Sequence, residues 1–197
     1  MKSALGAAGI LLAGCAGSVE PGRRVALTGQ VLDARGPIPD AFVYVKEGLE
    51  GLRFDPPAEP AVLDQRGLEF VPRVLGVRVG QPLRITSSDD TIHNVNAASL
   101  RNEGFNVNLL KDESIVRVFR RPEVMIVVKC DYHGHMRAYV GVVEHPYFAV
   151  TGPDGRFRWP DLPAGTYTLG AWVEHGGVRE LRVRAGPEEV SPIVFRF

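Results

Sequence analysis

The feature that most restricts the fold of this chain is a series of short apolar runs with a period of two. Such runs cover residues 75–79, 83–85, 105–109, 115–119, 123–130 and 138–143. A period of two places alternate side chains on opposite faces of a β-strand. The 22 glycines and 15 prolines supply the turns between runs. No stretch after the N-terminus shows a convincing helical period, so the sequence predicts an all-β protein built from sandwiches or barrels.

One segment interrupts this pattern. Residues 51–64 contain three prolines and show little periodicity. Proline removes a backbone donor, and clusters of it mark loops. We therefore expect a loop over this range.

The N-terminus has the composition of an export signal. Lys2 is followed by the apolar run ALGAAGILLAG, which is too short to span a bilayer comfortably. The next residues, LAGC ending at Cys15, resemble the lipobox of bacterial lipoproteins. That resemblance implies cleavage after residue 14 and lipid on Cys15. The short polar stretch there, 15–24, is expected to be a tether. An ordinary secretion signal with an incidental cysteine is the alternative.

The lipobox resemblance also implies a location. The chain would be exported to the periplasm or cell envelope and would touch the membrane only through the lipid on Cys15. Ala16 stands where an Asp would indicate retention at the inner membrane in that family, so the outer membrane is expected where the cell has one.

The charge balance bears on nucleic-acid binding, and the cysteine count bears on disulfide and metal chemistry. The chain carries 23 basic and 23 acidic residues, and basic residues alternate with acidic ones, so no nucleic-acid partner is expected. Cysteine occurs twice. If Cys15 carries lipid, Cys130 is left without an intramolecular disulfide partner. A free thiol in an exported protein is open to oxidation unless it is buried or bound to a metal.

Two distant segments resemble one known module. The tail resembles the carboxypeptidase regulatory-like module in its spacing of Thr151, Asp154, Gly155, Phe157, Leu162, Pro163, Gly165, Tyr167 and Leu169. The first strand pattern of that module is found instead at Leu27, Gly29, Val31, Asp33, Gly36, Pro39, Ala41, Val43 and Val45. The tail alone would have an unpaired edge and a small core. We therefore expect one Ig-like sandwich formed by 25–50 and 146–197, with a second β domain, 51–145, inserted in it.

The stretch KCDYHGHM carries most of the chemistry. Cys130 shares a strand face with the apolar positions 124, 126 and 128, so its thiol points inward. A buried structural cysteine is one interpretation. However, His133 and Met136 follow at three-residue intervals, and His93 lies at the end of an earlier strand. Two His and one Cys with a weak axial Met form the type 1 copper arrangement.

Residues 68–145 resemble cupredoxins, and the Cys-x2-His-x2-Met loop is similar to the short loop of amicyanin. The resemblance implies a Greek-key β-sandwich with one copper ion and assigns its ligands to His93, Cys130, His133 and Met136. It also implies that the backbone N–H of Asn94 donates to the Cys130 sulfur. This chain departs from the CDxHPWM loop of related exported proteins at Gly134 and His135, and His135 adds a rival imidazole.

The whole chain resembles exported bacterial proteins that combine a plastocyanin-like copper domain with a carboxypeptidase regulatory-like module. This resemblance implies a one-electron carrier that serves redox partner proteins and is not an enzyme. The chain also lacks the hydrolase, zincin and nucleotide-binding motifs. Two alternatives stay open: a periplasmic copper carrier without electron relay, which participation of His135 would favour, and a cell-surface interaction module with a vestigial copper site.

Overall fold

A computed structural model describes residues 19–186 and 192–197, and this part of the chain contains strands and no helix. The all-β prediction is confirmed. The signal segment 1–14, Cys15 and the first tether residues lie outside the described residues. The described part holds no helix that could cross a membrane. The strands are β1 (Val19–Asp33), β2 (Gly36–Pro37), β3 (Phe42–Glu47), β4 (Ala61–Gln65), β5 (Phe70–Val71), β6 (Val74–Arg78), β7 (Pro82–Ser87), β8 (His93–Ala98), β9 (Phe105–Leu109), β10 (Ser114–Val118), β11 (Glu123–Lys129), β12 (Arg137–Val143), β13 (Phe148–Val150), β14 (Arg156–Val173), β15 (Gly177–Ala185) and β16 (Ile193–Arg196).

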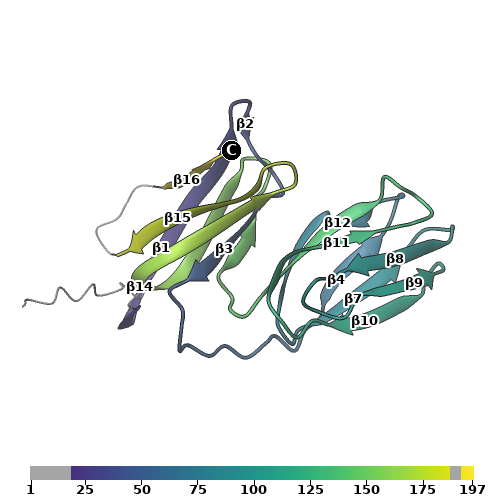
Figure 1. Cartoon of the computed structure of the whole chain (residues 1–197), viewed down its shortest axis with the longest axis horizontal. Coiled ribbons are helices and arrows are strands. Elements are labelled where there is room, and N and C mark those ends of the chain that lie inside the picture. The colour runs from purple at the N-terminus through teal and green to yellow at the C-terminus, as the bar shows by residue number, and fades with distance from the viewer. Residues whose placement is uncertain (1–18, 187–191) are drawn as a thin grey trace, which may run out of the picture.

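One sheet is built from the two ends of the described chain, and we call it the terminal-segment sheet. Its seven strands run in the order β13-β3-β14-β1-β16, with β15 on β14 and β2 on β1. The long β14 pairs with β1 through its first half and with β3 and β15 through its second half. Strands before residue 50 therefore share a sheet, and one buried core, with strands after residue 145 (Figure 1).

Two boundaries differ from the sequence expectation. β1 already begins at Val19, and Arg24 pairs with Pro163 of β14, so residues 19–24 belong to the sheet and not to the tether. β4 begins at Ala61, inside the range expected to be a loop. Its inward positions are Leu63 and Gln65. Because one of these is polar, the period of two was hidden.

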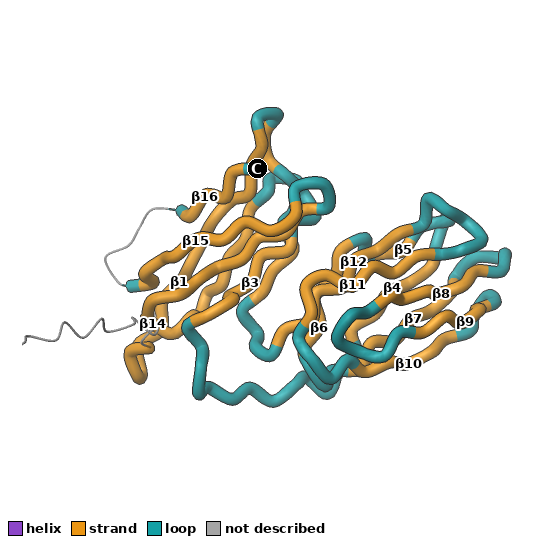
Figure 2. The backbone as a smooth tube through the Cα atoms, in the orientation of Figure 1, coloured by secondary structure: helices purple, strands orange, loops and turns teal. Residues whose placement is uncertain are grey.

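The strands between residues 61 and 143 form what we call the central sandwich. One sheet has the order β10-β7-β4-β5 and the other β6-β12-β11-β8-β9. The pairs β4–β7 and β6–β12 are parallel, which a hairpin cannot produce, so the chain crosses between the sheets (Figure 2). Leu83 and Ile85 from one sheet and Ile126 and Val128 from the other are fully buried in a shared core.

The central sandwich packs on the terminal-segment sheet at two glycines. Gly76 of β6 and Gly141 of β12 are opposite each other in their strand pair. The rings of Phe42 and Phe148 lie directly over them, and an added Cβ would come within 2.5 Å of a ring carbon at either glycine. Phe42 is fully buried in this contact. Only glycine permits this close approach of ring to sheet.

His145 lies where the chain leaves the central sandwich for the terminal-segment sheet. Its Nε2 donates to the carbonyl of Val45 at 2.7 Å, and its Nδ1 accepts the N–H of Tyr147 at 3.2 Å. Both bonds suit the neutral imidazole. Burial lowers the pKa of His145 to about 4, and the charge of Arg78 acts in the same direction, against the hydrogen bond to Val45.

This depressed pKa predicts a stability loss in mild acid. In the unfolded chain the histidine has its ordinary pKa of 6.5 and binds a proton as the pH falls below that value. In the folded protein His145 binds the proton only near pH 4. Between pH 7 and pH 5 the free energy of unfolding should fall by roughly 1–2 kcal/mol through His145. Urea unfolding at several pH values measures this. His145→Gln should remove that part of the slope, and His175→Gln, at a 91% exposed side chain, should keep it. An unaltered slope in His145→Gln would contradict the assignment.

Candidate metal centre

Strand pairing brings the predicted ligands together. His93 is the first residue of β8, and Cys130 directly follows the last residue of β11. β8 and β11 are antiparallel neighbours, with Lys129 opposite Asn96. The start of one strand and the end of the other therefore lie at the same end of the sheet. His133 and Met136 lie on the short loop that connects β11 to β12.

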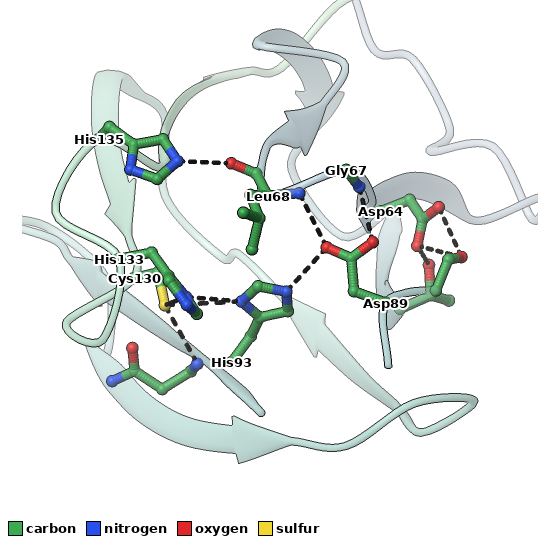
Figure 3. Close-up of polar contacts among 11 residues, drawn as sticks. Asp64, Gly67, Leu68, Asp89, His93, Cys130, His133 and His135 are labelled. Carbon is green, nitrogen blue, oxygen red and sulfur yellow. Dashed lines mark hydrogen bonds and ion pairs between the residues drawn. The ribbon is translucent and has the colours of Figure 1, made fainter. Parts of the chain in front are cut away.

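Three donor atoms converge at this end. Nδ1 of His93 and Nδ1 of His133 are 3.1 Å apart, and Sγ of Cys130 lies 3.9 Å and 3.6 Å from them (Figure 3). Within the described residues, these three side chains form a group whose ligand atoms all lie within 4.8 Å of one another. His93 is fully buried, Cys130 is 2% exposed, and His133 is partly exposed.

The spacing of these donors fits a transition-metal ion. Imidazole nitrogens bind such ions at ~2.0 Å and thiolates at ~2.3 Å, so three donors around one ion in a plane lie ~3.5–3.8 Å apart. The observed separations of 3.1, 3.6 and 3.9 Å bracket this range. Two imidazoles and a thiolate match the preferences of copper. The residues present therefore fit the predicted copper ion.

Backbone hydrogen bonds shape the loop around Cys130. The N–H of Cys130 donates to the carbonyl of Met136 at 3.2 Å, and the N–H of Met136 donates to that of His133 at 2.9 Å. The backbone nitrogen of Asn94 lies 3.5 Å from the Cys130 sulfur, which is the contact that the cupredoxin resemblance implies. The Met136 side chain is buried in the same cluster as Cys130. Its role as the fourth ligand stays a prediction.

The side chain of Asn94 holds the residue after the cysteine, which the sequence did not indicate. Its Oδ1 accepts the N–H of Asp131 at 2.6 Å, and its Nδ2 donates to the Asp131 carboxylate at 3.0 Å. Asn96 and Asn106 donate to the same carboxylate. Hydrogen bonds from Asn94 and Asn96, with that from Lys129, hold the pKa of Asp131 far below its usual range. Because these donors come from different strands, no local motif reveals the network.

Asp89 is the second residue that the sequence did not single out as part of the site. Its carboxylate lies 2.9 Å from Nε2 of His93 and accepts the backbone N–H groups of Gly67 and Leu68. Partial burial raises the pKa of Asp89, but the bonds from Leu68, Gly67 and His93 outweigh it and lower the pKa overall. A position four residues before His93 is the only sequence signal for it.

His135 does not join the three donors. It is exposed, and its Nε2 lies 3.1 Å from the carbonyl oxygen of Leu68. Its ring centre is 6.4 Å from that of His133. Leu68 thus accepts from His135 while its N–H donates to Asp89. The ring that the sequence left open as a rival ligand is engaged with a backbone carbonyl.

Comparisons with known proteins find likenesses in structure only. No protein-family model matches the chain, and no curated protein does. A Cu-containing nitrite reductase from Thermus scotoductus matches at 23% identity and a TM-score of 0.40, covering 47% of this chain and 24% of that enzyme. A purple cupredoxin from Nitrosopumilus maritimus matches at 19% identity and a TM-score of 0.37, covering 42% of this chain and 98% of the cupredoxin. An amicyanin variant in its Cu(I) form matches at 19% identity and a TM-score of 0.38, covering 42% of this chain and 81% of the amicyanin. This chain therefore spans about a quarter of the nitrite reductase.

The Asn94 network predicts a measurable stability. Asn94→Ala should lower the free energy of unfolding of the metal-free protein by about 1–3 kcal/mol, because the Asp131 N–H and carboxylate lose partners beside a buried site. Urea unfolding measures this. Asn108 is the control: it lies on β9, is exposed, and its side-chain oxygen accepts the Tyr132 hydroxyl at 3.3 Å, away from Asp131. Equal losses in Asn94→Ala and Asn108→Ala would show that the network contributes nothing specific.

Proposed function

We propose that this protein is a type 1 copper protein that carries single electrons, with one copper ion held by His93, Cys130, His133 and Met136. The observation that carries the proposal is the convergence of two imidazole nitrogens and one buried thiol within 4.8 Å at the end of the central sandwich. Sulfur and imidazole together accommodate both Cu(I) and Cu(II), so the bound ion would supply one-electron redox chemistry.

The surroundings of the donors support electron transfer. His93 and Cys130 lie at the ends of paired strands. Asp89 is hydrogen-bonded to the His93 ring, and Asn94 is hydrogen-bonded to Asp131, which follows Cys130. Donors fixed in this way move little when the charge of a bound ion changes. A small rearrangement lowers the barrier to electron transfer. The backbone N–H that faces the Cys130 sulfur would stabilise the thiolate form that a copper ligand requires.

The remaining parts of the proposal concern location and partners. We infer that the chain is exported and anchored by lipid on Cys15 in the cell envelope, and that it exchanges electrons with redox partner proteins. His133 is the donor of the three with partial exposure, which favours it as the point of electron exit. The terminal-segment sheet would serve as a spacer or docking surface.

Participation of His135 as a ligand would favour the copper-carrier alternative. In that interpretation a third nitrogen donor would help Cu(I) to enter and leave. The contact of His135 with the Leu68 carbonyl gives that interpretation no support. We therefore retain the carrier and the vestigial-site interpretations only as outcomes of the experiment below.

The test is visible absorption and EPR of the protein loaded with Cu(II). We expect an intense thiolate-to-copper band and a narrow parallel hyperfine splitting, both lost in Cys130→Ser. A type 2 signal without the band would rule out the electron carrier and leave copper carriage. Absence of bound copper would leave the interaction module.

The two loop histidines provide a matched pair of variants. His133→Ala should abolish the band and weaken copper binding at least about tenfold, because it removes a donor. His135→Ala should keep the band, because its ring contacts a carbonyl instead. The opposite pattern would assign the ligand role to His135.

A further inference from the structure

Asp89 is not one of the predicted copper ligands, but its side chain contacts one of them, His93. Its Oδ2 lies 2.9 Å from Nε2 of His93, and its side chain is 16% exposed. An ionised carboxylate only accepts hydrogen bonds, so Nε2 of His93 must carry the proton and donate it. In the neutral imidazole, Nδ1 then keeps its lone pair, and it faces Cys130 and His133. The contact selects the tautomer in which His93 binds a metal through Nδ1.

The carboxylate is itself fixed in place. Its Oδ1 accepts the N–H of Gly67 at 2.6 Å, and its Oδ2 accepts the N–H of Leu68 at 2.9 Å as well as the His93 ring. Three donors thus converge on two oxygens. An amide at this position has one oxygen, and its NH2 group would face a donor. An asparagine would therefore lose at least one of the three bonds.

The turn that supplies these donors has a strained backbone. Gly67 and Leu68 have φ angles of 67° and 61°, in the left-handed region that a leucine rarely adopts. The hydrogen bonds to Asp89 hold Leu68 in this conformation. They also present its carbonyl to His135 on the ligand loop. Asp89 therefore connects His93 of β8 to the loop that carries His133 (Figure 3).

We propose that Asp89 is a positioning residue of the copper centre, which orients His93 and sets the relative affinity for the two copper oxidation states. This inference rests on the proposed copper site. A carboxylate bound to the far nitrogen makes the imidazole a stronger donor. Its negative charge also favours the ion of higher charge. Both effects favour Cu(II) over Cu(I) and keep the potential low.

Asp64 offers a matched control. It lies on β4, which pairs with β7, the strand that precedes Asp89 in the chain, and its carboxylate accepts the hydroxyl groups of Thr86 at 2.6 Å and Ser88 at 2.8 Å. Ser88, which donates to Asp64, directly precedes Asp89, so the two acidic side chains lie in the same region of the structure (Figure 3). The hydrogen bonds of the Asp64 carboxylate go to Thr86 and Ser88 and not to His93, Cys130 or His133. Asp64→Asn removes one nearby charge and leaves the His93 hydrogen bond in place.

The experiment is a redox titration of the copper-loaded protein. Asp89→Asn should raise the ratio of Cu(I) to Cu(II) affinity at least tenfold, which is an upward shift of about 59 mV for one electron. Asp64→Asn should change that ratio less than threefold. Equal shifts in both variants would overturn the positioning role, since a general charge effect would then explain them. No shift in Asp89→Asn would also overturn it.

A second measurement needs neither copper nor a variant. Nitrogen–proton NMR of the histidine rings in the metal-free protein should show His93 with its proton on Nε2 and in slow exchange with solvent. A proton on Nδ1 would overturn the inference. If the copper spectra fail while this signal is present, the proposed function falls and the orienting contact stands. If the spectra succeed and the signal is absent, the reverse holds.

Discussion

The antiparallel pairing of β8 with β11 is the constraint on which the candidate site depends. It brings the first residue of one strand beside the residue that follows the other, so His93 and Cys130 meet without any long loop. Residues on the same strands, such as Val95 and Val128, are fully buried in the core between the two sheets. A slip of one residue would turn His93 and Cys130 outward together with their apolar neighbours. The hydrophobic core therefore fixes the orientation of the donors.

Two carboxylates stabilise this arrangement from opposite directions along the chain. Asp89 precedes His93 and holds its ring, and Asp131 follows Cys130 and holds the side chain of Asn94. Both accept several N–H donors, and both have a lowered pKa. An ionised carboxylate beside a buried site is costly unless its oxygens are hydrogen-bonded. Here one donor to each acid belongs to the site: the His93 ring donates to Asp89, and Asn94, whose backbone N–H faces the Cys130 sulfur, donates to Asp131.

Features that depend on local sequence spacing could be predicted, and contacts between residues far apart in the sequence could not. The short alternating runs placed the strands of the central sandwich, and the Cys130-x2-His133-x2-Met136 spacing placed three donors on one loop. β4 was missed because Gln65 faces inward beside Leu63. The contacts of Asp89 and Asp131 were missed because their partners come from separate strands and turns. A single sequence records residue types and local spacing, and neither reveals which amide donors a fold will gather around one carboxylate.

The junction between the two units decides how the terminal-segment sheet can act. Arg73 forms an ion pair with Glu174, but both side chains are partly exposed, and such pairs contribute at most ~1 kcal/mol. Burial of an aromatic ring such as Phe42 is worth roughly 1.5–3 kcal/mol. Its ring lies against Gly76 and Gly141, where no larger residue fits. Packing therefore dominates the junction. This packing places the terminal-segment sheet directly against β6 and β12, and β12 begins where the loop that carries His133 and Met136 ends.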